Sequence, residues 1–546
     1  MPSLVQSVDW TALAPAAIPA VLALVVLVAD LFLPKARKEL LAWITVAGLV
    51  LAALALIPLR AGRHATFCVT VVHPGTAADL PAGGGGCSYA ADHFTLVIQA
   101  LVLGGALLTA LLSVNTQDDL PAGEYWFLLL ASASGAALLP ASRDLATLIV
   151  ALEVATLPAF ALVGLRRGDK LSSEAALKFF LSSVTATAVS LLGISFVYAA
   201  TGTMHLAAVA DGLTHAPAQL VTVAKVGAAL TLVGFAFKLA AAPFHFWVPD
   251  TYAGAPLPVA AYLSVVGKAA GFSGLILVSV IAFKPYHDVW GPAFGVLAAL
   301  TMTVGNVGAL RQRPGVPRGA VRLLAWSSIG QAGYLLVPLA AASSAADPAH
   351  EIGTTVAYAL MYAVVNLGAF AVAALVSRSA PQGRLSDYRG LYATRPLAAL
   401  ALGFFLLCLA GLPPGVIGLF AKVAVFSSAV GTQHGWLAVI MAVNVVIALV
   451  YYLRWTALLF TRPEGAPEQS PSAVTSGVTT GGATGGASGG TSGVTTGVTT
   501  GGALAAVPVT RTPVGLVAAI TLTALAGVAL SGAPQLVLRY AQGSLF

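Results

Sequence analysis

The 546-residue sequence has few charged residues, because Lys, Arg, Asp and Glu together make up only 9% of it. A typical soluble domain contains about 25%, so this shortage excludes an ordinary soluble fold. Recognisable cofactor motifs are also missing: the three cysteines form no Cys-x-x-Cys cluster or haem motif, and no glycine fingerprint of a nucleotide-binding loop occurs. We therefore expect no bound cofactor and no metal in this chain.

Long apolar runs dominate what remains, since 58% of the residues are hydrophobic and the mean hydropathy is +0.90. A helix of roughly 20 apolar residues spans a bilayer, whereas a transmembrane β-barrel would show alternating segments of about 10. The sequence predicts an all-α polytopic membrane protein of about fourteen spans. The runs lie near residues 14–34, 40–59, 92–113, 124–141, 143–164, 174–200, 222–247, 256–283, 289–310, 319–342, 352–377, 396–429, 434–460 and 512–532.

The cations in the loops predict the orientation, because Lys and Arg are enriched on the cytoplasmic side. With the N-terminus outside, 17 of the 27 cations fall in inner loops and 5 in outer loops. We expect a multi-pass protein of a bacterial-type cell membrane with both termini outward. The net charge of +7 is explained by these loop cations, so the charge does not indicate nucleic-acid binding.

The chain divides into five segments. Residues 1–123 hold three spans, the first retained and not a cleaved signal, with an outer loop over 60–92. Residues 124–283 and 284–461 hold five spans each, 462–510 are a flexible linker rich in Ser, Thr and Gly, and 511–546 hold the last span. In the outer loop, Cys68 and Cys87 either form a disulfide or remain free thiols, while Cys408 is expected to be an apolar filler inside a span.

Six charges lie inside apolar runs, namely Glu153, Lys178, Lys225, Lys238, Lys268 and Lys422. Each costs roughly 2.5 to 3.5 kcal/mol near the bilayer centre, so four or five unpaired ones would cancel a typical domain stability of about 5 to 15 kcal/mol. They must face one another, water or a partner. Counted along their runs, Glu153, Lys238 and Lys268 lie near mid-membrane. Lys225 is expected to reach the surface, and Lys178 is either a surface-reaching residue or an inner gate.

Two of these lysines adjoin predicted helix breaks. Pro243 follows Lys238, and the sequence Gly411-Leu-Pro-Pro-Gly415 precedes Lys422. Proline removes a helix hydrogen bond, and the freed carbonyls beside a buried amine can hold water. Broken helices at corresponding positions of two halves indicate an ion path between inverted five-helix repeats.

Three motifs carry a family resemblance. The stretch from Pro243-Phe-His-Phe-Trp-Val-Pro-Asp to Ser264, followed by Lys268, resembles the signature of the antiporter-like membrane subunits of respiratory complex I and of Mrp-type cation/proton antiporters. The sequence Leu324-Ala-Trp-Ser-Ser-Ile-Gly-Gln-Ala-Gly-Tyr334 and the Gly411–Gly415 motif are similar to the matching motifs of the second half. A lysine at position 422, with no lateral helix, resembles the subunit N branch.

The resemblance implies a role for each buried charge. Glu153 pairs with Lys238, Lys268 connects the two halves, and Lys422 lies toward the exit of a proton path. Lys178 is similar to an additional lysine of the subunit N branch. His245 lies beside the first break, where it is either a proton carrier or a hydrogen-bonded anchor.

The resemblance also implies a proton-translocating subunit of an NADH-quinone oxidoreductase, driven by redox chemistry in other subunits. NADH, FMN, Fe-S clusters and quinone would belong to the assembled complex, and the partners would be other membrane-arm subunits, the bilayer and the quinone pool. The alternatives are an Mrp-type Na⁺(K⁺)/H⁺ antiporter subunit, an M-like subunit of a related complex, and a purely structural subunit.

Several polar residues leave two interpretations open. Asp250 is expected to be a helix cap or a loop anchor. Some polar side chains of the second half either line a water path or join helices by hydrogen bonds, and these are Ser327, Ser328, Gln331, Tyr362 and Asn366.

Overall fold

The computed structural model describes residues 8–62, 64–68, 86–114, 120–461 and 513–539. Thirteen helical segments in this part of the chain are long and apolar enough to cross a membrane. The shorter apolar helices α16 (Pro396–Ala410) and α17 (Val416–Gly431) follow each other where a further span was predicted. The expected helical membrane fold of about fourteen spans is confirmed, while the linker over 462–510 lies outside the described residues.

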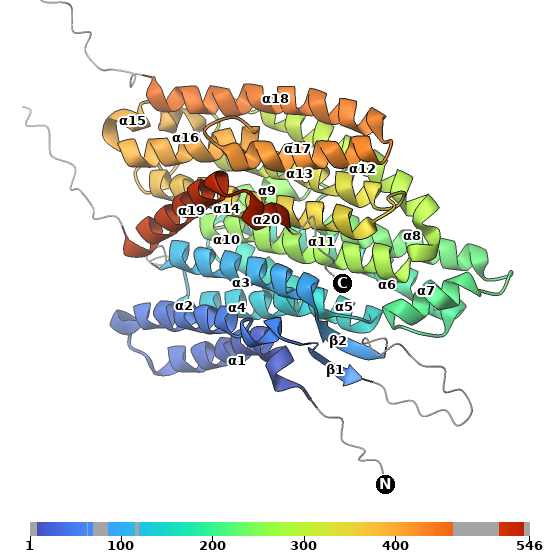
Figure 1. The fold of residues 1–546 in the computed structure, drawn as a ribbon. Helices are drawn as coiled ribbons and strands as arrows, with labels where there is room; N and C mark the ends of the chain where they lie inside the picture. Colours follow the sequence, from blue (N-terminus) through green and yellow to red (C-terminus); the bar gives the residue numbers. More distant parts are fainter. Residues whose placement is uncertain (1–7, 63, 69–85, 115–119, 462–512, 540–546) are drawn as a thin grey trace, which may run out of the picture.

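The long helices lie side by side in one bundle (Figure 1). They are α1 (Trp10–Phe32), α2 (Glu39–Leu54), α3 (His93–Ser113), α4 (Ala122–Leu138), α5 (Leu145–Val163), α6 (Lys170–Thr201), α8 (Val221–Lys238), α12 (His287–Leu310), α13 (Gly319–Ala341), α14 (Pro348–Ser377), α18 (Gly435–Phe460) and α19 (Val514–Gly532). Short helices complete the chain, namely α7 (Leu206–Thr214), α9 (Val248–Gly254), α10 (Leu257–Tyr262), α11 (Lys268–Ile276), α15 (Leu391–Thr394) and α20 (Gln535–Leu538). Brief 3-10 turns lie at Lys35–Arg37, Pro58–Arg60, Leu139–Ala141, Lys284–Tyr286 and Leu385–Tyr388.

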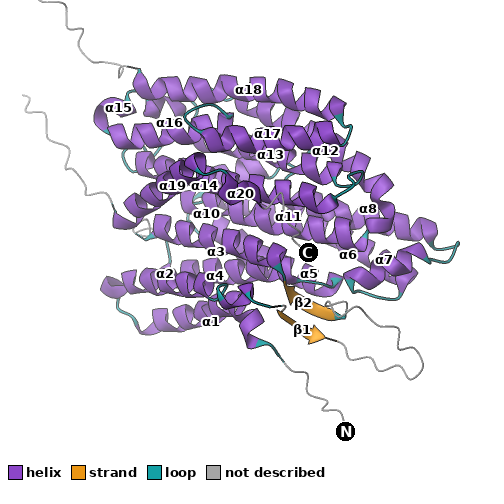
Figure 2. Cartoon of the chain, in the orientation of Figure 1, coloured by secondary structure: helices purple, strands orange, loops and turns teal. Residues whose placement is uncertain are grey.

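A small hairpin departs from the all-helical expectation. Strands β1 (His64–Cys68) and β2 (Cys87–Ala91) pair antiparallel beside the start of α1 (Figure 2). Cys68 and Cys87 form a disulfide between the strands, which decides the alternative that the sequence left open. The hairpin is also held to α1, because Asp9, the residue before that helix, accepts a hydrogen bond from His64 at 3.0 Å.

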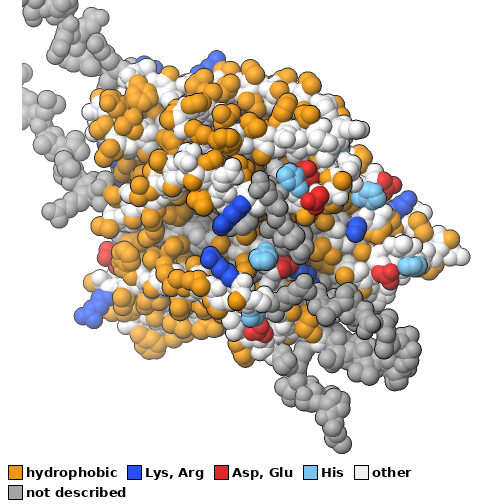
Figure 3. All heavy atoms as spheres, in the orientation of Figure 1, with side chains coloured by type: hydrophobic (Ala, Val, Ile, Leu, Met, Phe, Trp, Pro, Cys, Tyr) orange, Lys and Arg blue, Asp and Glu red, His pale blue; other side chains and the backbone are white. Residues whose placement is uncertain are grey.

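The bundle surface and its contacts suit a membrane. Hydrophobic side chains cover most of the face in Figure 3, where charged groups are few. Inside, small residues bring helices close, as is usual where lipid gives no hydrophobic drive for helix association. A Cβ at Gly193 of α6 would lie 2.7 Å from the carbonyl oxygen of Gly227 in α8, so only glycine permits this approach.

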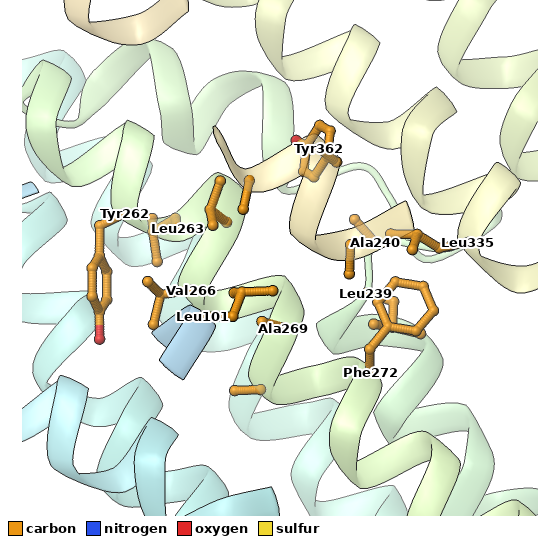
Figure 4. Close-up of a cluster of buried hydrophobic side chains, with 14 of the residues drawn as sticks. Leu101, Leu239, Ala240, Tyr262, Leu263, Val266, Ala269, Phe272, Leu335 and Tyr362 are labelled. Carbon is orange, nitrogen blue, oxygen red and sulfur yellow. The ribbon is translucent and has the colours of Figure 1, made fainter. Parts of the chain in front are cut away.

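Both predicted helix breaks are present. α8 ends at Lys238 and α9 begins at Val248, and α16 ends at Ala410 before α17 begins at Val416. Figure 4 shows Leu239 and Ala240 of the first break beside Phe272 and Leu335, so buried apolar side chains surround the break. The inverted relation between the two halves stays a prediction.

The eighth predicted span contains a feature that the sequence did not predict. Between α10 and α11 the chain forms a π-helical turn over Leu263–Gly267, and a second one follows over Leu277–Ala282. Such turns are rare and often lie at functional sites. The first of them ends directly before Lys268.

Candidate functional site

Lys238 and Glu153 meet inside the bundle. The Lys238 Nζ atom lies 3.6 Å from Glu153 Oε1, and the two side chains are 4% and 22% exposed. Lys238 is the last residue of α8, where the helix ends before the proline-containing break. The sequence therefore places the amine at the broken end of one helix and the carboxylate in the middle of α5.

Hydroxyl groups complete this pair. Ser183 of α6 accepts a hydrogen bond from Lys238 Nζ at 2.7 Å, and Thr156 of α5 accepts one at 3.3 Å. Thr187, one helical turn beyond Ser183, donates to Glu153 Oε1 at 2.7 Å. The ammonium and the carboxylate each have a neutral hydrogen-bond partner besides the opposite charge, as buried charges require.

A small cavity adjoins the pair. Its volume is about 30 Å³, and its lining includes Lys238, Thr156, Ser132, Tyr262 and Gly267. One water needs about 10 to 15 Å³ of such space, so the cavity is large enough for one or two waters. It extends from the Lys238 amine to the helical turn that precedes Lys268.

Lys268 is buried, with 3% exposure, and its Nζ donates to the backbone carbonyl of Ser328 in α13. The Ser328 hydroxyl accepts a hydrogen bond from Tyr362 of α14 at 2.8 Å. Asn366, one turn beyond Tyr362, donates to Ser264 of the π-helical turn at 2.7 Å. Lys268 therefore joins the first half of the chain to polar side chains of the second half.

The polar contacts continue along α13 to the second break. Gln331 donates to the Leu409 carbonyl at 3.4 Å and accepts from Tyr358 at 2.5 Å. Tyr452 of α18 lies between Gln331, at 3.2 Å, and Ser327, at 2.5 Å. The polar residues for which the sequence allowed two roles thus form two hydrogen-bonded groups on α13, one around Ser328 beside Lys268 and one around Gln331 beside the second break.

Lys422 of α17 turns back to the broken end of α16. Its Nζ donates to the carbonyls of Leu409 and Ala410 at 2.8 and 2.7 Å and lies 5.4 Å from the Tyr334 ring centroid. These carbonyls are free because α16 ends there. The Leu409 carbonyl therefore accepts from both Gln331 and Lys422, which links the polar group of α13 to the last buried lysine.

Lys178 lies apart from this group. Its side chain is 48% exposed and makes ion pairs with Glu174 at 2.7 Å and Asp250 at 3.0 Å. Asp250 also accepts from Arg322 at 2.8 Å, so it is an anchor between helices. Lys225 is exposed and lies 5.9 Å from the Tyr286 ring, in agreement with its expected position near the surface.

His245 lies in the first break, partly buried, with its ring 5.6 Å from that of Trp326 in α13. Its Nδ1 atom is buried and has no hydrogen-bond partner among the residues that the structure describes. The described residues contain no group of three or more His, Cys, Asp or Glu side chains that could hold a metal.

An ion pair at the loops joins the two halves. Asp169, the N-cap of α6, accepts from Arg318 at 3.1 Å, and Arg318 also donates to the Ala253 carbonyl at 2.6 Å. Burial alone would raise the pKa of Asp169, but the hydrogen bonds from Arg318 and from the Leu171 and Ser172 amides lower it overall.

Several site residues were not identified from the sequence. Ser183 and Thr187 carry a weak signal, since their four-residue spacing places both on one face of α6. Glu351 was missed because it lies just before the eleventh apolar run. In the structure it is buried in the first turn of α14 and accepts from Ser428 of α17.

Comparison with known families and curated proteins gives one consistent result. Residues 142–448, more than half of the chain, match the family described as NADH:quinone oxidoreductase/Mrp antiporter, TM. The chain is 67% identical over 545 residues to NADH-quinone oxidoreductase subunit N 2 of Streptomyces griseus, covering 100% of this chain and 95% of that protein. It is 44% identical to NADH-quinone oxidoreductase subunit N of Salinispora tropica, covering 85% and 87% of the two chains.

Solved structures agree on the fold. A chain of respiratory complex I from Thermus thermophilus is similar at 29% identity, with a TM-score of 0.69 and coverage of 96% of this chain and 98% of that chain. A chain of the Mrp complex from a Dietzia species has a TM-score of 0.74 at 22% identity, covering 97% and 96% of the two chains. The second likeness concerns the fold alone.

Proposed function

The chain belongs to the antiporter-like, proton-translocating membrane subunits of NADH-quinone oxidoreductase, as a subunit N, and we propose that its protons move along Glu153, Lys238, Lys268 and Lys422. One observation carries this route. Buried charges and hydrogen-bonded polar groups follow one another from Glu153 to Lys422 through both halves, with a cavity that can hold water beside Lys238 and a step between Ser328 and Gln331, one turn apart on α13.

The first step depends on the Glu153–Lys238 pair. A carboxylate 3.6 Å from the amine favours the protonated lysine by direct attraction. Moving Glu153 away, or changing a neighbouring charge, removes that attraction, and Lys238 then releases its proton. Thr187, which holds Glu153, and Ser183, which holds Lys238, fix the resting geometry from the same helix.

The released proton then reaches Lys268 through water in the cavity next to Lys238. From Lys268 it passes the hydroxyls and the amide around Ser328 and Gln331 toward Lys422. The breaks after α8 and α16 release backbone carbonyls from helix hydrogen bonds, and carbonyls of this kind can orient water. His245 lies within the first break as a second group that can carry a proton.

The Lys178 side chain has a different part in this scheme. It is half exposed and tied to Glu174 and Asp250, and Asp250 is tied to Arg322. We assign Lys178 to the inner gate region, where these ion pairs hold α6, α9 and α13 together. A rearrangement of this cluster would change the access of inner water to Lys238.

Energy for the switching comes from quinone reduction in other subunits of the complex, where NADH, FMN, Fe-S clusters and quinone bind. The partners of this chain are the other membrane-arm subunits and the bilayer, and both termini face outward. A Na⁺(K⁺)/H⁺ antiporter has weaker support, because the relatives at 67% and 44% identity are named as subunits of NADH-quinone oxidoreductase.

The test is an alanine series at Glu153, Lys238, Lys268 and Lys422 in the assembled complex in membrane vesicles, scored for both quinone reduction and proton translocation. Each variant should reduce coupled proton translocation at least about tenfold, which is a conservative bound because a positioned proton-transferring group typically contributes about 10² to 10⁴ in rate. Lys225→Ala is the matched control, since this lysine is also on α8 but exposed. Four variants that pump like the parent complex would leave this subunit a purely structural role.

A further inference from the structure

A line of polar side chains runs along α14. Beginning at Glu351, the positions advance by four, three, four and four residues, which keeps them on one helix face. All of these side chains are buried, and they are Glu351, Thr355, Tyr358, Tyr362 and Asn366. We call this set the α14 polar stripe.

The C-terminal part of the α14 polar stripe, near the centre of the membrane, contacts the proposed proton route. Asn366 donates to Ser264, Tyr362 donates to Ser328 and Tyr358 donates to Gln331. Its other end is Glu351, in the first turn of α14. This end faces outward in the topology predicted from the loop cations, so the stripe leads from the centre of the membrane toward the outer surface.

The Glu351 carboxylate is 6% exposed and accepts a hydrogen bond from the Ser428 hydroxyl. Within the described part of the chain, none of the ion pairs includes Glu351. A buried carboxylate without a cation is costly in a membrane protein and is usually functional. Glu351 therefore needs an explanation beyond packing.

Stabilisation of the helix end does not supply that explanation. An acidic residue in the first turn of a helix is favoured by the helix dipole, but that effect does not require burial. The capping position of α14 is already filled, because Asp347 accepts from the Ala349 amide at 3.1 Å. The Glu351 side chain points instead to α17, the helix that carries Lys422.

Ser428 lies between the Glu351 carboxylate and Lys422, on the same helix as that lysine. It lies six residues after Lys422, which is about 9 Å along a helix at 1.5 Å per residue. Both residues belong to the buried side of α17, which packs against α13 and α14. A short chain of a few waters spans an axial distance of this length, and the transfer proposed below requires such a chain between Lys422 and Glu351.

We propose that Glu351 is the outer proton acceptor of this subunit, which receives the proton from Lys422 and releases it at the outer surface. The Lys422 ammonium loses a proton to water and becomes a neutral amine, while the Glu351 carboxylate gains a proton and becomes a carboxylic acid. The acid then gives this proton to outer water and returns to the carboxylate. Ser428 is a positioning residue that orients the carboxylate. This inference rests on the proposed function, because it requires Lys422 to carry protons.

The test compares Glu351→Gln with Glu351→Asp in the intact complex in membrane vesicles. Glutamine keeps the size of the side chain and a carbonyl oxygen that accepts from Ser428, but it cannot exchange a proton. Aspartate keeps the exchangeable proton. We expect Glu351→Gln to lower coupled proton translocation at least about tenfold, and Glu351→Asp to retain a larger share of it.

Two further variants keep the outcomes apart. Glu124→Gln changes an exposed glutamate of α4 and should pump like the parent complex. Lys422→Met tests the proposed function itself. If Lys422→Met abolishes pumping while Glu351→Gln pumps normally, the route stands and the role of Glu351 is wrong. If Lys422→Met also pumps normally, the proposed function fails. Equal losses for Gln and Asp at position 351, with less assembled complex, would give Glu351 a structural role and overturn the inference.

Discussion

Changing the charge at Glu153 should change proton movement in a graded way. Its carboxylate lies 3.6 Å from the Lys238 ammonium. At an effective dielectric constant of about 20, two unit charges at this distance attract by about 5 kcal/mol. Glu153→Asp shortens the side chain by one carbon, which lengthens the separation to about 5 Å and leaves about 3 kcal/mol. Glu153→Gln removes the attraction but keeps the size of the side chain.

Losing this attraction in Glu153→Gln shifts the equilibrium between charged and neutral Lys238 toward the neutral form by more than about a thousandfold. Even if nearby water and Ser183 recover two thirds of the energy, about a tenfold change remains. The rate of proton translocation should therefore decrease in the order Glu, Asp, Gln, with Gln at least about tenfold below Glu.

The assay follows NADH-driven proton uptake by membrane vesicles with a pH-sensitive dye, together with quinone reduction in the same sample. Glu124→Gln is the control, because Glu124 is half exposed and 3.9 Å from Arg167. Equal rates for Glu, Asp and Gln at position 153 would refute the electrostatic reasoning.

Three further predictions concern other parts of the molecule. Lys422→Met removes the titratable amine and its hydrogen bonds to the Leu409 and Ala410 carbonyls, and it should lower proton translocation at least about tenfold in the vesicle assay. The hydrogen bond to Asp9 raises the pKa of His64 and, reciprocally, lowers that of Asp9. Charged His64 therefore stabilises the contact between the hairpin and α1 fully below about pH 6.5, and this stabilisation is lost as the pH rises through the raised pKa. Amide hydrogen exchange in β1, corrected for its intrinsic pH dependence, should therefore become faster over that range, and unchanged protection would contradict the role of His64. Mass mapping without reductant should find Cys68 and Cys87 linked. Closing this loop lowers the entropy of the unfolded chain, which stabilises the folded protein by about 3 kcal/mol. Two alkylatable thiols would contradict the disulfide.

The sequence predicted the parts of the site that carry a clear physical cost. Lys238, Lys268 and Lys422 were identified because charged residues are rare inside apolar runs, and both helix breaks were predicted because proline cannot donate a backbone hydrogen bond. The structure adds the distances, and it brings Glu153 to Lys238 across 85 residues of chain.

The missed residues carry no comparable signal. Ser183 and Thr187 are hydroxyl residues in a membrane helix, where such residues often bond to their own backbone or to a neighbouring helix. Glu351 lies at the start of an apolar run, so by sequence it resembles a loop charge. The π-helical turn before Lys268 packs against α3 and α14, and the local sequence carries no signal for it.

Lys178 shows how tertiary contacts can change an interpretation. Its position in the apolar run suggested a surface-reaching residue or an inner gate. In the structure it pairs with Glu174, one turn earlier, and with Asp250, which lies 72 residues away and also binds Arg322. The Lys178–Glu174 pair is local to α6, and only the fold brings Asp250 and Arg322 to it.

Lys268 gives the most direct test of the route, because it connects the Lys238 side of the molecule to the polar group around Ser328. The measurement is the rate of NADH-driven proton translocation by Lys268→Met complexes in membrane vesicles, relative to Lys225→Met complexes assembled to the same level. We expect a loss of at least about tenfold at position 268 and none at position 225. Proton translocation at the parent rate in Lys268→Met would contradict a proton route through Lys268.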